Sequence, residues 1–182
     1  TLRNRGWELS VNWSDQLKNG FSYGIGFNIF DYKAVVTKYN NPEGLIYNNH
    51  TGLVRNKGYY QGMDLGEIWG YEANDLFLTN QEVDEYLREV DMSFFKPNKD
   101  WQRGDLKYID SNGDGKIDPD SGTLKDHGDL KIIGNTTPRY SFGLNLHAGY
   151  KGFEVSALFQ GVMKRDFPMA ASTYLFSGDS NF

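Results

Sequence analysis

The fold is decided by residues 140–160, which read YSFGLNLHAGYKGFEVSALFQ. Apolar side chains alternate with small or polar ones on both sides of Lys151-Gly152, and only Leu158 breaks the pattern. A period of two over this length is typical of half-buried β-strands. A two-residue turn at Lys151-Gly152, where glycine tolerates a positive φ, predicts an antiparallel hairpin. The predicted partners are Tyr150 with Phe153, Ala148 with Val155, Leu146 with Ala157, Leu144 with Phe159, and Phe142 with Gly161.

A second hairpin is predicted near the start of the chain, where residues 7–14 and 21–29 alternate in the same way. A three-residue loop at Lys18-Asn19-Gly20 keeps both apolar rows on one face. An even-numbered loop would turn one of them over, so the loop length is informative. The predicted partners are Trp13 with Ile25, Val11 with Phe27, and Leu9 with Ile29.

Between Val36 and Pro138 lies a connection of on the order of a hundred residues, far longer than the usual loop of about 4–6. Such a segment must hold structure of its own. Thr79 and Glu82 have the spacing of a capping box, which predicts a short helix over 80–90. Its apolar positions would be Val83, Tyr86, Leu87 and Val90, and Pro97-Asn98-Lys99 would interrupt the chain afterwards.

The fold class expected is therefore all-β with a small α+β insertion. The predicted segments are strands over 1–36, an insertion over 37–137, and strands with the start of a further loop over 138–182. A short turn, a very long connection and a second short turn follow one another, as in outer-membrane barrels, where periplasmic turns are short and extracellular loops long. The polar strand face carries mainly Gly, Ser and Asn, which suits a crowded barrel interior. The alternative is a soluble sandwich whose apolar face points inward.

Composition excludes several classes of function. The chain has no cysteine, so disulfides, thiolate catalysis and cysteine-bound zinc are ruled out. A net charge of −5 without a Lys/Arg cluster gives no nucleic-acid footprint. No apolar run approaches the roughly 20 residues of a membrane helix. The chain starts at Thr1 without a methionine or signal peptide, which predicts a mature or trimmed product.

The strongest local motif runs from Asp110 to Asp118 and reads DSNGDGKID. Oxygen-bearing side chains stand at relative positions one, three, five and nine, and glycine stands at six, as in EF-hand-type calcium loops. Position twelve departs from the pattern, because Ser121 replaces the bidentate Glu. The alternative is a turn held by Asx hydrogen bonds. The predicted Ca²⁺ ligands are Asp110, Asn112, Asp114, the backbone carbonyl of Lys116, and Asp118, with Asp120 or Asp129 as further oxygen donors.

Four aromatic residues of the insertion are candidates for stacking on a sugar: Tyr59, Tyr60, Trp69 and Tyr71. Packing of the insertion is the alternative role for them. No catalytic constellation is recognisable, because Glu82 and Asp84 fit a solvated helix face and none of the three histidines has a triad-like partner nearby. We therefore expect a protein that is not an enzyme. The three histidines are His50, His127 and His147.

An ordered set of blocks resembles the C-terminal part of SusC/RagA transporters, although no single block is convincing alone. The resemblance covers nearly the whole chain, and the stretch 119–130 is longer than in the shortest family versions. The blocks are NRGWEL (4–9), GEIWGY (66–71), GDLKYIDSNGDGKID (104–118), IIGN (132–135), PRYSFGLN (138–145), YKGFEV (150–155) and FQG (159–161).

The resemblance implies strands of a transmembrane β-barrel in the bacterial outer membrane, with residues of about 37–135 as an extracellular lobe. It implies a TonB-energised importer of oligosaccharides or peptides that works with a SusD-like surface lipoprotein. The TonB box and plug of such proteins belong to an N-terminal region that is absent from these 182 residues. The competing hypothesis is a soluble, calcium-stabilised β domain that binds a glycan or a protein partner. A hydrolase is a distant third.

Overall fold

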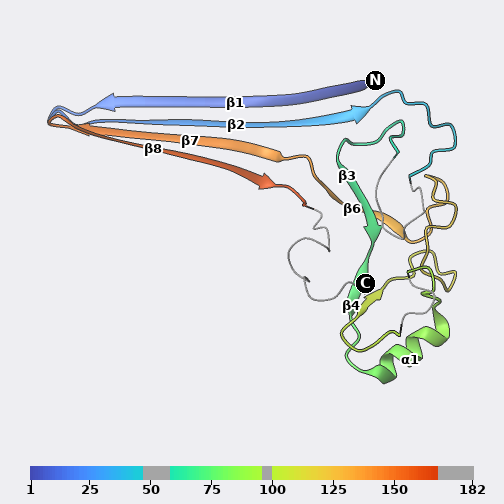
Figure 1. The fold of residues 1–182 in the computed structure, drawn as a ribbon. Coiled ribbons are helices and arrows are strands. Elements are labelled where there is room, and N and C mark those ends of the chain that lie inside the picture. The colour runs from blue at the N-terminus through green and yellow to red at the C-terminus, as the bar shows by residue number, and fades with distance from the viewer. Residues whose placement is uncertain (47–57, 96–99, 168–182) are drawn as a thin grey trace. The chain divides into compact units, whose positions relative to one another are not determined.

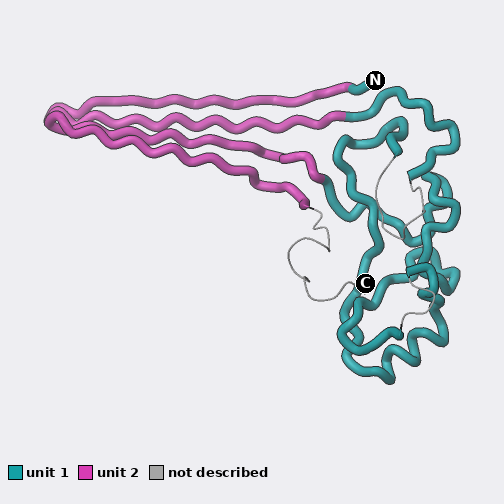
Figure 2. The backbone as a smooth tube through the Cα atoms, viewed as in Figure 1, with its two compact units in different colours: residues 1–2, 35–135 teal, residues 3–34, 136–182 magenta. Residues whose placement is uncertain are grey.

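A computed structural model describes residues 1–46, 58–95 and 100–167. The described chain divides into two compact units (Figure 2). Unit 1 comprises residues 1–2 and 35–135, and unit 2 comprises residues 3–34 and those from 136 onward. The predicted break at Pro97-Asn98-Lys99, the histidine His50 and the predicted further loop over 168–182 lie outside the described residues.

Unit 2 is built on a four-stranded sheet with the order β1-β2-β7-β8 (Figure 1). Its strands are β1 (Leu2–Gln16), β2 (Ser22–Val36), β7 (Arg139–Tyr150) and β8 (Phe153–Lys164). Within the described residues this sheet is open, with β1 and β8 at its edges. Strands that are adjacent in the sheet are also consecutive along the chain, apart from the long insertion between β2 and β7.

The hairpin of β7 and β8 has the register that the sequence predicts. Tyr150 lies opposite Phe153, and the pairing continues through Leu146 with Ala157 to Phe142 with Gly161. The turn residues Lys151 and Gly152 both have positive φ, 49° and 87°. Positive φ at both central positions is the type I′ geometry, whose twist matches that of the strands.

The hairpin of β1 and β2 closes through the predicted three-residue loop. Leu17 N–H donates to the carbonyl of Phe21 at 2.8 Å, and Gly20 has a φ of 85°. A Cβ added to Gly26 would lie 2.7 Å from Asn12 Oδ1, which places these two residues opposite each other. A pairing of Asn12 with Gly26 has the same register as the predicted pairing of Trp13 with Ile25.

The two hairpins join along β2 and β7, which pair antiparallel from Ser22 with Gly149 to Phe30 with Ser141. One face of the resulting sheet is apolar and largely uncovered. The exposed fractions reach 81% for Phe153, 70% for Val155 and 61% for Trp13. These residues are far more exposed than a sandwich core would leave them.

Unit 1 contains two small antiparallel ribbons and one helix. Strand β3 (Glu67–Tyr71) pairs with β6 (Leu130–Asn135), and β4 (Ala73–Leu76) pairs with β5 (Leu106–Tyr108). Its main apolar cluster comprises Val36, Ile46, Tyr60, Met63, Trp69 and Leu130. Unit 1 therefore has a core of its own, as the length of the connection requires.

Helix α1 (Asn80–Glu89) lies where the capping box predicts a helix, and it ends one residue earlier, at the cap Val90. The Thr79 side chain accepts a hydrogen bond from Glu82 N–H at 3.1 Å. The Glu82 carboxylate accepts from Leu78 N–H rather than from Thr79, so the box is one residue wider than the standard motif. Val83 is buried, and the helix is anchored there.

The expected all-β class is confirmed, since antiparallel strands dominate and α1 is the one α-helix among the described residues. In residues 1–46, 58–95 and 100–167, no helix combines the length and the apolar character that crossing a bilayer requires.

Candidate functional site

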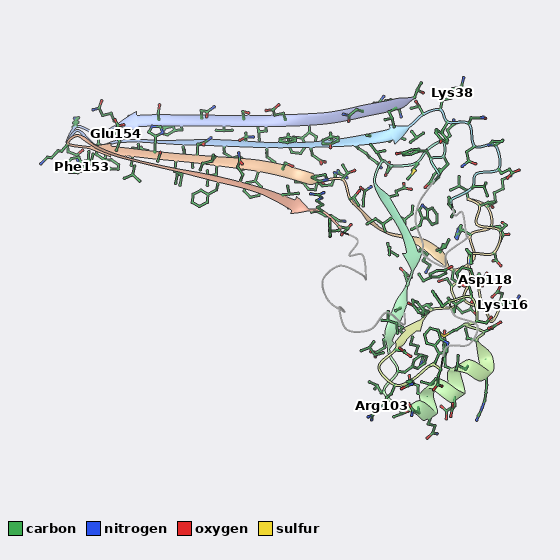
Figure 3. The ribbon with its side chains drawn as sticks, in the orientation of Figure 1. Lys38, Arg103, Lys116, Asp118, Phe153 and Glu154 are labelled. Carbon is green, nitrogen blue, oxygen red and sulfur yellow. The ribbon has the colours of Figure 1, made fainter. Side chains whose placement is uncertain are left out.

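The Asp110–Asp118 loop lies between β5 and β6 and is docked on the segment that follows α1. Ile117 is fully buried, and its N–H donates to the carbonyl of Asp91 at 2.9 Å. Asp91 N–H donates in turn to the carbonyl of Gly115 at 2.8 Å, so Asp91 and Lys116 form a parallel β-bridge. The loop is thus held by backbone pairing on one side. Figure 3 labels Lys116 and Asp118 on this loop.

The first three predicted ligands are oriented by the loop's own backbone. Asp110 accepts from Gly113 N–H at 2.6 Å and from Gly115 N–H at 2.8 Å. Asn112 Oδ1 accepts from the N–H of Asp114. Gly113 and Gly115 have φ values of 78° and 81°, a conformation that strains residues with a Cβ. The Asx turns that sequence offers as the alternative are therefore present. The Asp114 carboxylate continues the series by accepting from Lys116 N–H at 2.9 Å.

Asp129 closes the loop by accepting hydrogen bonds from residues near its two ends. Its side chain is almost completely buried, with Oδ1 accepting from Ser111 N–H at 2.5 Å and Oδ2 from Asp118 N–H at 3.1 Å. Burial raises the pKa of the Asp129 carboxyl, and the backbone hydrogen bonds oppose that rise. Sequence offers Asp129 as an extra metal ligand. In the structure, its two carboxylate oxygens instead join the two ends of the loop.

Negative charge accumulates at the far end of the loop. Asp118 Oδ1 accepts from Asp120 N–H at 2.8 Å, and Asn112 Nδ2 donates to Asp120 Oδ2 at 3.1 Å. Burial, followed by the negative charges of Asp118, Asp126 and Asp114, raises the pKa of the Asp120 carboxyl. A hard cation at this end would relieve that repulsion.

The donor set suits Ca²⁺ in chemistry, since it consists of carboxylates, an amide and a backbone carbonyl. Each side-chain oxygen that accepts one N–H keeps a second lone pair. Among the described residues, however, no three acidic or histidine side chains gather as a ready metal-binding group. Ser121 Oγ is engaged with the carbonyl of Asp126 at 3.0 Å. Binding of Ca²⁺ by Asp110, Asn112, Asp114, Lys116 and Asp118 stays a prediction.

The four aromatic candidates for sugar stacking have different surroundings. Tyr60 and Trp69 belong to the buried cluster, with ring centroids 6.5 Å apart, and the Tyr60 hydroxyl donates to Glu67. Tyr71 packs edge-on against Phe95 at 5.0 Å. Tyr59 is 46% exposed and lies edge-on to a further tyrosine, 5.5 Å away. Sugar stacking stays a prediction, and Tyr59 of the four is the best exposed for it.

Both described histidines pack against neighbouring residues of their own unit. The His147 ring lies over Gly24 on the polar face of the sheet, and the His127 ring packs 5.6 Å from that of Trp69. The expectation that the protein is not an enzyme stays a prediction.

Sequence reasoning missed an ion pair between β2 and β7. Arg139 donates from Nε to Asp31 Oδ1 at 2.6 Å and from Nη2 to Oδ2 at 2.5 Å, and Asp31 is only 7% exposed. Tyr140, with a φ of 54°, donates its N–H to the same carboxylate at 3.3 Å. The sequence feature that could have revealed this ion pair is Asp31, an acidic residue that follows a row of apolar side chains at the odd-numbered positions 21–29.

Among curated proteins, the chain is similar to the TonB-dependent receptor P3 of Formosa agariphila. The two are 25% identical over 183 aligned positions, which cover 99% of this chain and 17% of that receptor. The chain thus spans less than a fifth of the length of the relative that it matches. No family model matches the chain. The similarity indicates that this chain resembles a part of a TonB-dependent receptor.

Proposed function

We propose that the chain is a segment of a TonB-dependent outer-membrane transporter of the SusC/RagA type. Unit 2 would supply consecutive strands of the transmembrane barrel, and unit 1 would be an extracellular insertion between two of them. The observation that carries the proposal is the uncovered apolar face of a four-stranded antiparallel meander, with Val155 70% exposed and Phe159 53% exposed. Lipid is the solvent that such a face fits.

Strand length supports the same proposal. The four strands contain 12 to 15 residues, and a tilted transmembrane strand needs about 9–11. The opposite face bears mainly Gly, Ser and Asn, which fit a barrel interior. Backbone that is irregular, as in much of unit 1, would leave unpaired polar groups in hydrocarbon at a cost of several kcal/mol each. We therefore place residues 37–135 outside the bilayer.

The cargo and partners follow from the resemblance. We expect import of oligosaccharides or peptides with a SusD-like surface lipoprotein, energised by TonB through another part of the protein. We further expect the Asp110–Asp118 loop to bind Ca²⁺, which would hold the loop against the segment after α1. The exposed Tyr59 is the first residue to test for contact with substrate.

The lipid-facing assignment is tested with a bimane fluorophore attached to Phe159→Cys or to Gln160→Cys. The chain itself has no cysteine. Each variant would be made in the full-length protein and reconstituted in vesicles that contain brominated lipid. We expect bimane at position 159 to be quenched several-fold more than at position 160, because neighbouring strand residues point to opposite faces.

The result has two other informative outcomes. Strong quenching at 160 and weak quenching at 159 would reverse the faces and contradict the proposal. Recovery of the full-length protein from the aqueous fraction, with neither position quenched, would favour the soluble calcium-stabilised domain that binds a glycan or a protein.

A further inference from the structure

Strands β2 and β7 pair in one continuous register although no tight turn joins them. In both hairpins of unit 2 a short loop sets which residues lie opposite each other. Between Val36 and Arg139, by contrast, about a hundred residues intervene, and no tight turn there sets the register. The side chains of the two strands are therefore the features to compare.

The apolar face cannot supply this information. Its pairs include Ile25 with Leu146 and Phe27 with Leu144. A shift by two residues keeps every side chain on its own face, because the strand period is two. It would pair Ile25 with Ala148 or with Leu144, and both pairs are still apolar.

The opposite row distinguishes these registers, because four of its five pairs join one glycine to one larger residue, and Phe30 with Ser141 is the exception. The four pairs are Ser22 with Gly149, Gly24 with His147, Gly26 with Asn145, and Asn28 with Gly143.

In three of these pairs the larger side chain occupies the space that its glycine partner leaves. At Gly26 the nearest atom to an added Cβ is Asn12 Oδ1 of β1 at 2.7 Å, and Asn145 Cβ lies 3.6 Å away. A Cβ on Gly24 would fall within the imidazole of His147. On Gly143 it would lie 2.5 Å from Asn28 Oδ1, and on Gly149 it would lie 2.8 Å from Ser22 Oγ. We call these four pairs the glycine sockets.

Both shifts by two residues break part of this complementarity. One direction sets Gly24 against Gly149 and Asn28 against Asn145, which leaves a hole in one place and crowding in another. The other direction sets Gly26 against Gly143 and Ser22 against His147. The hairpin of β7 and β8 also contains such pairs, Gly143 with Gln160 and Gly149 with Glu154, but there the tight turn at Lys151-Gly152 already sets the register.

The Arg139–Asp31 ion pair marks the end of the same ladder. The two-pronged hydrogen bond fixes Arg139 to one carboxylate beside the last β2–β7 pair, Phe30 with Ser141. A shift of two residues would move the partners by about 7 Å along the strands and leave the largely buried Asp31 without its cation.

We propose that the glycine sockets, together with the Arg139–Asp31 pair, set the register between β2 and β7 and thereby join the two hairpins across the insertion. This inference goes beyond the proposed function and holds whether the apolar face meets lipid or protein. Its test consequently stands apart from the bimane experiment.

The test uses engineered disulfides in the full-length protein, because this chain has no cysteine of its own. Facing residues have Cα atoms about 4.5–5.5 Å apart, within disulfide range, whereas diagonal neighbours about 7–8 Å apart are not. Ile25→Cys with Leu146→Cys reports the native register. Ile25→Cys with Ala148→Cys, or with Leu144→Cys, reports the two shifted registers. Leu146→Cys with Ala157→Cys reports the β7–β8 hairpin and is the control.

We expect Gly24→His to lower the yield of the native-register disulfide several-fold, because two imidazoles would then share one socket. The double variant Gly24→His/His147→Gly restores one large and one small residue, and we expect it to recover most of the yield. The hairpin control should change little in either variant, since its register is set by Lys151-Gly152.

Two results would overturn the proposal. One is a native-register yield that Gly24→His leaves unchanged. The other is an equal loss in the single and the double variant, because filling the socket from the other strand would then have no effect. Recovery in the double variant supports the proposal even if the single variant also loses the hairpin disulfide.

Discussion

At the scale of single residues, Asp129 shows how a buried charge organises a loop. Its two oxygens accept N–H groups from Ser111 and Asp118, which lie seven residues apart in sequence. A carboxylate offers two acceptors in one plane and no donor. Burial opposes the charge and raises the pKa of Asp129, yet no neutral side chain of the same size satisfies both N–H groups.

The substitution Asp129→Asn therefore tests whether the two hydrogen bonds of the Asp129 carboxylate stabilise the loop. The amide offers one acceptor and turns an NH₂ group toward the second N–H, so one buried donor loses its partner. We expect a local loss of about 1–3 kcal/mol. Hydrogen exchange of the Ser111 and Asp118 amides in the full-length protein would measure it.

The matched control for this variant is Asp126→Asn, which removes an exposed charge from the same region. We expect it to change exchange at Ser111 and Asp118 little. Equal exchange in Asp129→Asn and the unmodified protein would mean that backbone pairing alone holds the loop.

At the scale of elements, what could be predicted follows from how local the determinants are. The turn at Lys151-Gly152 and the loop at Lys18–Gly20 fix both hairpins, and Thr79 with Glu82 fixes the start of α1. These signals lie within a few residues of the structure that they specify. Sequence did not predict the pairing of β2 with β7, since its determinants are about a hundred residues apart.

The calcium-type loop shows the same division. The spacing of Asp110, Asn112 and Asp114 predicts the turns that the loop adopts, because each Asx side chain reaches only a few residues along the backbone. The two anchors of the loop, Asp91 and Asp129, are distant in sequence. Sequence named Asp129 only as a possible metal ligand, and it did not predict the backbone pairing with Asp91.

Calcium binding by this loop is an element-scale prediction. Isothermal titration of the full-length protein with Ca²⁺ should show a site with a Kd of about 10⁻⁴–10⁻³ M, as in extracellular modules. We expect Asp114→Ala to weaken that site at least about ten-fold, because a ligand at position five is lost. The control Asp84→Ala removes an exposed acid from α1 and should leave the affinity unchanged. Titrations that are identical for all three proteins would show that the Asx turns serve structure alone.

At the scale of the whole molecule, the proposed transporter demands a topology. Both tight connections of unit 2, at Lys18–Gly20 and Lys151-Gly152, join strands at the end of the sheet opposite to the insertion. In an outer-membrane barrel such short turns face the periplasm and long loops face the outside. Residues of unit 1 and of the Lys18–Gly20 loop should therefore be reachable from opposite sides of the membrane.

Single cysteines in the full-length protein test this topology directly. Lys125→Cys places a thiol on the exposed surface of unit 1, and Lys18→Cys places one in the exposed β1–β2 loop. A membrane-impermeant maleimide added to intact cells should label position 125 and spare position 18, because the outer membrane shields the periplasmic turns. After the outer membrane is permeabilised, both positions should react, which shows that the thiol at position 18 can be labelled.

Labelling of position 18 alone in intact cells would reverse the assigned topology, with the short turns outside and unit 1 in the periplasm. Labelling of neither position until the membrane is opened would place unit 1 in the periplasm and remove the argument for an extracellular insertion.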